Sequence, residues 1–210
     1  MLTACTTEEY KSGDGYYSYM RADFAVAYTD ADGKMASVML DSGDSVIFAS
    51  PYNISDKAVA DSSYRGVLYY NINDGEISPR GFSGVVTLHP FGRYNFLSTA
   101  YDPMGWESMW ISKNRSYLNL SILPKMGTED GNDNKHAVGL LMDTVYVDTD
   151  GTKTCSLKLL HWQNDVPEYY TVQRYLSIPI ADFDSILTEG DKIQMTINTY
   201  DGEVVKTISY

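Results

Sequence analysis

The sequence is poor in basic residues and has no long apolar run. Sixteen Lys and Arg stand against 28 Asp and Glu among 210 residues, which gives a formal net charge of −12, and no basic run occurs. A surface of this charge repels phosphate backbones over most of its area, so the composition argues against nucleic-acid binding. No stretch approaches the roughly 18 consecutive apolar residues of a membrane-spanning helix, so no such helix is predicted.

Histidine and cysteine are also scarce, and their spacing fits no metal site. His89, His136 and His161 lie far apart in the sequence and share no short ligand spacing with the two cysteines. A zinc site needs several such ligands close together, so we predict no metal site and no cofactor.

Three oxygen-rich segments raise calcium as an alternative: 30–33 (DADG), 129–133 (EDGND) and 148–151 (DTDG). The first and the last lack the third acidic position and the downstream glutamate of an EF-hand loop. We therefore interpret 30–33 and 148–151 as tight turns, and 129–133 as a solvated loop.

No catalytic constellation is predicted. A base at His161, oriented by Asp165, would need a nucleophile such as Cys155 or Ser156. On one strand, Cys155 and His161 share a face but lie about 20 Å apart at ~3.3 Å per residue, and Ser156 lies on the other face. No Gly-x-Ser-x-Gly elbow supplies another serine. We predict that His161 and Asp165 form a structural polar pair, that Cys155 is a small buried residue, and that the protein is not an enzyme. Paired carboxylates for glycoside hydrolysis stay open, since so many acidic residues always permit some pair.

Cys5 has a different sequence context from Cys155. The residues LTA precede it, and this pattern resembles a bacterial lipobox, in which the cysteine is lipidated and becomes the mature N-terminus. The acidic pair at 8–9 is similar to the signal with which Bacteroides-group bacteria send lipoproteins to the outer face of the outer membrane. We expect 1–15 to be a lipobox remnant and tether, and the protein to be anchored through Cys5 in the outer membrane, exposed at the surface or facing the periplasm. A disulfide between the two cysteines is the alternative.

Tyrosine-rich runs between tight turns predict an all-β chain. Eighteen tyrosines favour β-structure, because the ring packs on a pleated sheet while the hydroxyl stays hydrated. We predict an N-terminal OB-like small barrel domain at 16–100, with 90–103 as the interdomain segment. Its expected strands are 16–29, 34–40, 45–49, 64–72 and 81–88.

Residues 101–210 are predicted to form an immunoglobulin-like β-sandwich domain, because strands recur at roughly 8–12 residue spacing between turn sequences. The turns at 148–151 and 201–202 predict two hairpins. The stretch 157–180 is predicted to be a long antiparallel hairpin, since two apolar runs flank a polar loop at 163–168.

Several blocks resemble the NigD-like family of Bacteroides-group cell-envelope lipoproteins. They are the lipobox-like start, YLNL at 117–120, His161 with Asp165, and YLSIP at 175–179. The resemblance implies an OB-like domain followed by an immunoglobulin-like sandwich on a lipid-anchored chain. It implies no catalytic residues at numbered positions here.

Aromatic residues are the candidates for a binding surface. Trp106, Trp110, Trp162, Tyr169 and Tyr170 are suited to stack on sugar rings or to form a protein-docking patch, with core packing as the alternative for each tryptophan. We expect a non-catalytic binding or assembly module of the cell envelope whose partner, besides the membrane, is an unknown protein or glycan. A glycan-binding accessory protein is the alternative function, and an uncatalogued hydrolase is the third.

Overall fold

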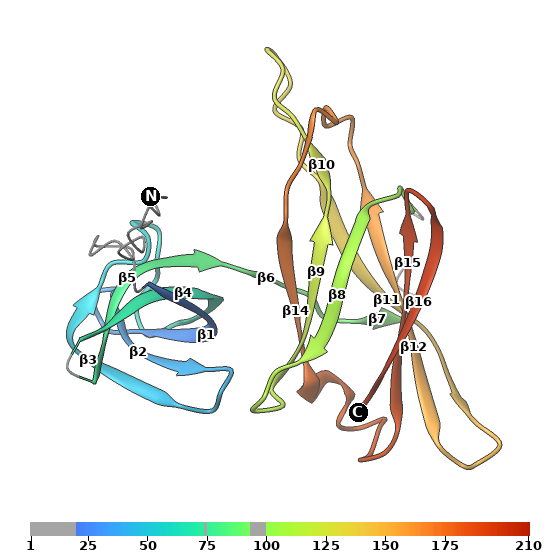
Figure 1. Ribbon diagram of the computed structural model, residues 1–210, viewed down its shortest axis with the longest axis horizontal. Coiled ribbons are helices and arrows are strands. Elements are labelled where there is room, and N and C mark those ends of the chain that lie inside the picture. The colour runs from blue at the N-terminus through green and yellow to red at the C-terminus, as the bar shows by residue number, and fades with distance from the viewer. Residues whose placement is uncertain (1–19, 74, 93–99) are drawn as a thin grey trace, which may run out of the picture. The chain divides into compact units, whose positions relative to one another are not determined.

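The computed structural model describes residues 20–73, 75–92 and 100–210 (Figure 1). The regular structure of these residues is β-strand, with turns and loops between the strands and the 3₁₀ turn η2 (Ile180–Phe183). The described residues include no helix long and apolar enough to cross a membrane. By its internal contacts the chain divides into two compact units. The first comprises the residues up to Met39 together with Ser45–Ser83, and the second comprises Leu40–Asp44 together with Gly84–Tyr210. The expected tether at 1–15, with Cys5, lies outside the described residues, and the predicted domain borders stay predictions.

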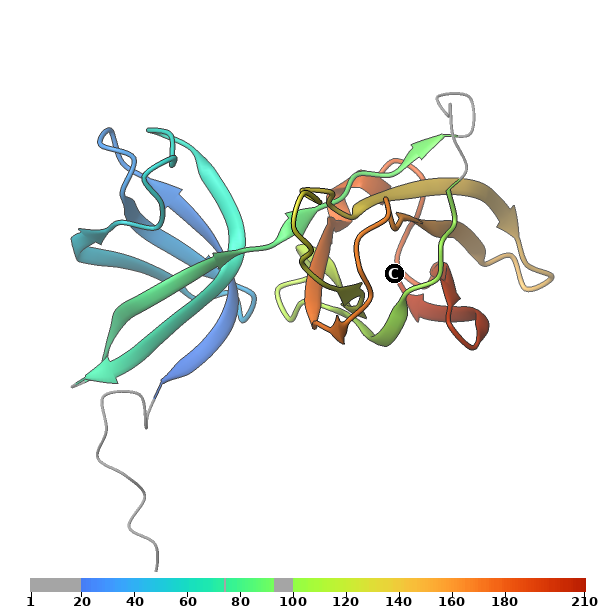
Figure 2. The same ribbon diagram turned by 90° about the horizontal axis from the view of Figure 1, so that it is seen from above.

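The first unit contains one five-stranded sheet that curls into a half-barrel (Figure 2). Small and long apolar side chains fill its interior, with Ala25, Ala27, Met35 and Leu68 all at 0% exposure. The strand order is β3-β2-β1-β4-β5. The strands are β1 (Arg21–Thr29), β2 (Met35–Leu40), β3 (Ser45–Tyr52), β4 (Ser63–Asn73) and β5 (Glu76–Gly84).

The second unit is a β-sandwich of a four-stranded and a five-stranded sheet. The four-stranded sheet has the order β6 (Val86–Thr87), β14 (Arg174–Pro179), β9 (Tyr117–Leu123) and β8 (Gly105–Ile111). The five-stranded sheet has the order β16 (Gly202–Ser209), β15 (Lys192–Thr199), β12 (Lys153–Trp162), β11 (Ala137–Val147) and β7 (Phe91–Gly92). The predicted fold class, an all-β chain that ends in a β-sandwich, is confirmed.

The sandwich core follows the two-residue period of its strands. Alternate side chains along each central strand point between the sheets, because successive residues of a strand face opposite sides. The sequence therefore supplies an apolar residue at every second position of β9, β12 and β15. These buried residues are Leu118, Leu120, Ile122, Cys155, Leu157, Leu159, Ile193, Met195 and Ile197.

The interpretation of 157–180 as one hairpin is wrong. Strands β12 and β14 belong to different sheets, so the chain crosses from one layer of the sandwich to the other between them. Strand β12 pairs antiparallel with β11 and parallel with β15, whereas β14 pairs antiparallel with β9 and parallel with β6. The connection between β12 and β14 is therefore free to project beyond the sheets.

Tight turns occur where the sequence predicts them. The Asp30 carboxylate accepts hydrogen bonds from the backbone N–H groups of Asp32 and Lys34, at 3.0 and 2.9 Å. The Asp150 carboxylate accepts one from the N–H of Thr152 at 2.9 Å, which lowers the pKa of that carboxyl group. Both predicted hairpins of the sandwich are present, and the last has Tyr200 and Asp201 as its loop, since Thr199 pairs with Gly202.

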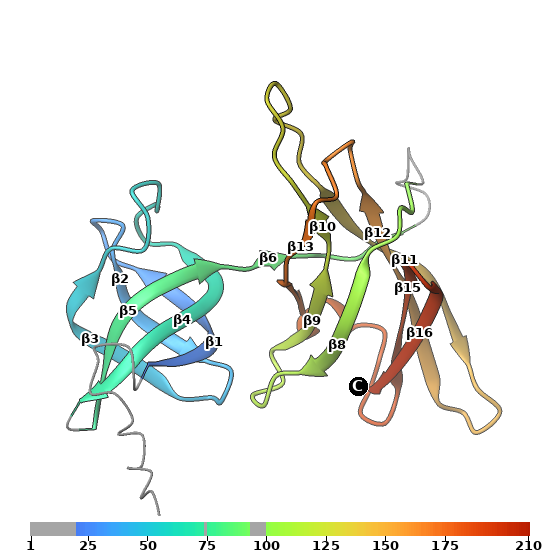
Figure 3. The ribbon, with the colours of Figure 1, turned by 45° about the horizontal axis from the view of Figure 1, so that its top comes forward.

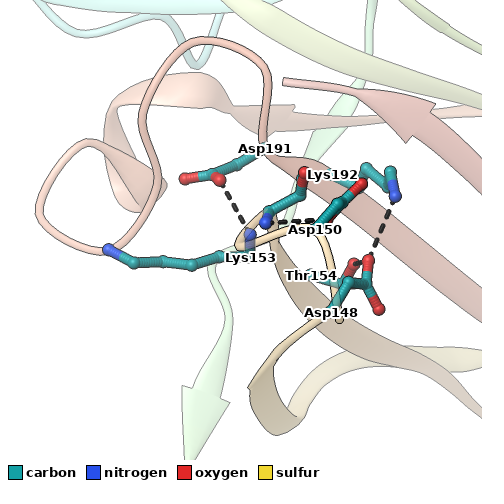
Figure 4. Close-up of polar contacts among 7 residues, drawn as sticks. Asp148, Asp150, Lys153, Thr154, Asp191 and Lys192 are labelled. Carbon is teal, nitrogen blue, oxygen red and sulfur yellow. Dashed lines mark hydrogen bonds and ion pairs between the residues drawn. The ribbon is translucent and has the colours of Figure 1, made fainter.

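Polar side chains fix the β11–β12 hairpin to the neighbouring strand β15 (Figure 4). The Asp148 carboxylate accepts hydrogen bonds from Thr154 Oγ1 at 3.1 Å and from Lys192 Nζ at 3.0 Å. Asp191 Oδ1 accepts one from the backbone N–H of Lys153 at 2.8 Å. Each of these carboxylates has a structural partner, which supports the assignment of this acidic region to turn chemistry.

Candidate functional site

Two loops extend together beyond the sheets at one end of the sandwich, as Figure 3 shows. We call residues 124–136 and 163–172 the two-loop arm. The first loop carries strand β10 (Lys125–Met126) and the second carries β13 (Tyr170–Thr171), and the two strands pair antiparallel. The arm therefore contains the connection that the crossing between the two sheets leaves free.

Backbone hydrogen bonds hold the two loops of the arm together on both sides of this short ladder. The N–H of Tyr169 donates to the carbonyl of Met126, and the N–H of Val172 donates to the carbonyl of Pro124, each at 3.0 Å. Gly127 allows the loops to approach this closely: a Cβ there would lie 2.7 Å from Tyr169 Cδ2 and 2.8 Å from the Pro167 carbonyl oxygen.

Side-chain amides add two further connections between the loops. Asn132 Nδ2 donates to the carbonyl of Asp165 at 2.9 Å, and Asn164 Nδ2 donates to the carbonyl of Lys135 at 2.7 Å. These bonds join the far part of the first loop to the start of the second. The arm is thus braced along its length.

The second loop begins with a strained turn. Asn164 and Asp165 have φ angles of 52° and 54°, and the N–H of Val166 donates to the carbonyl of Gln163 at 3.1 Å. Positive φ at both central residues is the signature of a type I′ turn, which Asn and Asp tolerate better than most residues. Val166, which follows the two central residues, is only 5% exposed, so the turn ends on a buried apolar side chain.

Two of the five predicted aromatic residues are exposed on this arm. Tyr169 is 66% exposed and Tyr170 is 53% exposed. Both follow the braced turn directly, so their backbone is held while much of each ring meets solvent. Neighbouring exposed rings of this kind are candidates for a surface that binds another molecule.

The three tryptophans are half-buried. Trp106 packs against the sandwich core, as the alternative interpretation predicted, and Trp110 makes an edge-to-face contact with Tyr175 at a centroid distance of 6.3 Å. Trp162 lies at the end of β12, where its ring approaches Gly139. Of the five candidates, Tyr169 and Tyr170 are therefore the ones that present most of their surface.

His136, the last residue of the first loop of the arm, contacts His161 on β12. Their rings stack with centroids 5.1 Å apart, and His136 Nδ1 lies 2.8 Å from His161 Nε2. His161 Nδ1 lies 3.2 Å from the carbonyl of Asp102, to which it must donate. In the neutral pair each ring therefore carries its proton on Nδ1, and His136 donates to His161.

Burial lowers the pKa of both histidines below the usual value. For His161, which is 1% exposed, burial is the largest cause, and the Asp102 carbonyl opposes it. For His136, the backbone of Lys125 and the charge of Glu168 oppose the effect of burial. Burial therefore favours the neutral form of both rings.

The prediction of a polar pair between His161 and Asp165 is wrong, because each residue bonds to other partners. His161 bonds to His136 and Asp102, and the Asp165 carbonyl accepts from Asn132. His136 is the residue that sequence reasoning missed, because it lies 25 positions from His161 and no local pattern connects them.

Cys155 is buried in the sandwich core, at 0% exposure and without a disulfide. Burial raises the pKa of its thiol to about 11. A thiol in this environment stays protonated at neutral pH and is a poor nucleophile. The interpretation of Cys155 as a small buried residue is confirmed.

The fold and the arm define an all-β protein with a C-terminal β-sandwich, in which the most exposed aromatic side chains among residues 20–73, 75–92 and 100–210 lie on a braced loop structure. The family model of the NigD-like C-terminal beta sandwich domain matches residues 95–210. The chain belongs to the NigD-like family. No curated protein matches it.

Three solved structures share this fold. A NigD-like immunity protein from Bacteroides caccae has 20% identity and a TM-score of 0.69, over 93% of this chain and 99% of that one. A putative toxin-related protein from Parabacteroides distasonis has 18% identity and a TM-score of 0.64, over 91% and 93%. A protein of unknown function from Bacteroides vulgatus has 19% identity and a TM-score of 0.59, over 90% and 91%. Each comparison covers nearly the whole chain, so the likeness includes both units.

Proposed function

We propose that this chain is a non-catalytic protein-binding module of the cell envelope, anchored by a lipid on Cys5, which recognises its partner through Tyr169 and Tyr170. The observation that carries the proposal is the exposure of these two rings, 66% and 53%, on an arm that hydrogen bonds brace. Holding the backbone in place before binding reduces the entropy lost on association.

A non-catalytic role fits the chemistry of the reactive side chains. The Cys155 thiol is buried and protonated, and His161 uses both of its ring nitrogens in hydrogen bonds. The described residues contain no group of three or more His, Cys, Asp or Glu suited to hold a metal ion. Binding through the arm needs none of these groups.

A protein partner is favoured over a glycan by the similar structures. The B. caccae structure is named a NigD-like immunity protein and the P. distasonis structure a putative toxin-related protein, and we take these names as support for a protein partner. Tyrosine suits such a surface, because its rigid ring contributes contact area and its hydroxyl group adds a hydrogen bond.

Site-specific photo-crosslinking in the cell envelope tests the proposal. We expect a benzoyl-phenylalanine introduced at Tyr170 to give a discrete protein adduct, identified by mass spectrometry. The same group at Val59, which is 62% exposed in the first unit, is the matched control. Absence of an adduct at Tyr170, or identical adducts at both positions, would contradict the proposal. Retention on a glycan array that Tyr169→Ala/Tyr170→Ala abolishes would instead support the glycan-binding alternative.

A further inference from the structure

The two-loop arm has an excess of negative charge. Its two loops contain five acidic residues and two lysines. Glu129, Asp130 and Asp133 are exposed, and among the described residues their carboxylates take part in no hydrogen bond or ion pair. Their charge is therefore available to a molecule that approaches the arm.

A hydrogen bond joins the acidic loop to the loop that carries the exposed tyrosines. The bond from Asn132 to the Asp165 carbonyl connects the acidic loop 129–133 to the second loop, four residues before Tyr169. An isolated β-bridge between Glu129 and Asn132 shapes the acidic loop itself. Aromatic rings and uncompensated carboxylates thus belong to one braced structure.

The arm already shows how it accommodates a cation. Lys125 Nζ lies 4.2 Å from the centroid of the Tyr200 ring and 3.2 Å from a carboxylate oxygen of Glu168. An ammonium group over an aromatic ring is attracted by the negative face of the ring, and a carboxylate neighbour strengthens the attraction. Glu129, Asp130 and Asp133, with the rings of Tyr169 and Tyr170, offer the same two kinds of group, and these three carboxylates form no ion pair with a described lysine.

We infer that the two-loop arm binds a basic polypeptide segment, whose Lys or Arg side chains meet the carboxylates of 129–133 and the rings of Tyr169 and Tyr170. This inference rests on the proposed function and adds the charge of the partner. The net charge of the whole chain, −12, acts in the same direction, because it draws a cationic segment toward the surface before contact. A neutral or acidic segment would leave the three carboxylates unpaired or repelled.

Selection of random dodecapeptides on the full chain carrying Cys5→Ser tests the inference. Peptides that the wild-type arm retains and the Tyr169→Ala/Tyr170→Ala variant does not retain are the arm-dependent set. We expect this set to be enriched in Lys and Arg over the unselected library. Its members should associate about tenfold more slowly with a Glu129→Gln/Asp130→Asn/Asp133→Asn variant at low ionic strength, with a smaller difference at high salt.

A charge-matched control separates a local effect from a general one. Asp32→Asn/Glu76→Gln/Glu189→Gln removes three exposed carboxylates elsewhere in the chain and changes the net charge equally. We expect this control to associate much faster than the triple variant of the arm. Equal slowing in both variants would show that only the total charge matters, and would overturn the inference.

The outcomes distinguish the inference from the proposed function. An arm-dependent set without basic enrichment would overturn the inference, while a protein adduct at Tyr170 would leave the proposed function standing. Failure to recover any arm-dependent peptide, together with no adduct at Tyr170, would overturn both.

Discussion

Cys155 and His161 lie on one strand and carry the two most reactive side chains of the sandwich, yet burial changes what each can do. Burial of the Cys155 thiol disfavours the thiolate and raises the pKa of the thiol to about 11. The His161 ring has partners on both nitrogens. An exposed cysteine could act as a nucleophile and an exposed histidine as a general base, but burial and hydrogen bonding prevent both roles here.

Thiol labelling tests the state of Cys155. In a Cys5→Ser background at pH 8, we expect labelling of the folded protein at least about a hundredfold slower than in denaturant, because only ~0.1% of a thiol with this pKa is ionised and the side chain is buried. The measurement is the rate of reaction with a chromogenic disulfide reagent. Labelling of the folded protein at the rate of a free cysteine would show that Cys155 is accessible.

Protonation of the histidine pair should destabilise the fold. The pKa values of His136 and His161 are lowered in the folded state, so below the usual value of 6.5 the unfolded chain binds protons that the folded chain does not. Stability is therefore fully present above that pH and falls as the pH decreases toward the folded-state values. Urea unfolding between pH 8 and pH 5 measures the slope, up to about 1.4 kcal/mol per pH unit for each such group.

Substitution of the pair identifies its share of this slope. We expect the His136→Gln/His161→Gln variant to lose most of the decrease in stability between pH 7 and pH 5. His89→Gln, at an exposed residue that contacts Asp182, is the control and should keep it. A wild-type slope retained in the double variant would assign the pH dependence to other groups.

Sequence reasoning at this scale succeeded where local pattern decides the outcome. Alternation along β12 predicted that Cys155 is buried, because the apolar neighbours on its face identify the core side. It did not predict the partner of His161, since His136 approaches only after β11 and β12 pair, with Val138 opposite His161. Contacts between strands depend on the register, which a single residue does not reveal.

At the scale of elements, the two-loop arm depends on close contact between its loops. Gly127 is the position where the approach is tightest, since the Cβ of any other residue would lie within 3.0 Å of both Tyr169 and Pro167. The same contact holds the backbone of Tyr169, whose ring is exposed. Packing at Gly127 and presentation of the tyrosines are therefore linked.

Substitution of Gly127 tests this link. We expect Gly127→Ala to push the loops apart and to cost about 1–3 kcal/mol, as in other overpacked sites. Amide hydrogen exchange should accelerate at Tyr169 and Val172, whose N–H groups bridge the loops. Gly84→Ala is the matched control, because a Cβ there meets nothing within 4 Å. Unchanged exchange in Gly127→Ala would show that the loops adapt without separating.

The elements of the sandwich were predictable where a short turn joins them. The turn at 148–151 correctly predicted the β11–β12 hairpin. The prediction of one hairpin at 157–180 failed, because two apolar runs around a polar loop have the same pattern whether the strands pair with each other or enter opposite sheets. The parallel pairing of β12 with β15 connects strands that are separated by the whole of β13 and β14, and no local signal encodes it.

At the scale of the whole molecule, the remaining expectation is the membrane anchor. Expression of the full-length precursor in a Bacteroides-group host should give a Cys5 modified by two or three acyl chains, visible by mass spectrometry, and a protein that fractionates with the outer membrane. Cys5→Ser should leave the membrane fraction, because the acyl chains supply the affinity at about 0.8 kcal/mol per buried methylene. An unmodified Cys5 in a protein that remains in the soluble fraction would contradict the proposed anchor.

Resemblance to a family predicted more of the whole molecule than any single pattern did. The blocks at 117–120 and 175–179 lie on β9 and β14, which pair across Leu118 and Ile178 in the centre of their sheet. The similar structures share 18–20% sequence identity with this chain, and a single sequence does not show where along the chain the identical residues lie. The sequence named Tyr169 and Tyr170 as candidates together with the three tryptophans, but only the structure shows that these two rings are the exposed ones, since exposure depends on how the loops fold back.

The crossing of the chain between β12 and β14 also decides what happens if the arm is cut. A protease that cleaved the exposed second loop would leave two pieces, and each piece contributes strands to both sheets. In the four-stranded sheet, β14 from the second piece lies between β6 and β9 from the first, and in the other sheet β15 borders β12. The pieces are interwoven, so a nicked protein should stay assembled until it is denatured, and its two halves are natural candidates for reassembly from separately produced fragments.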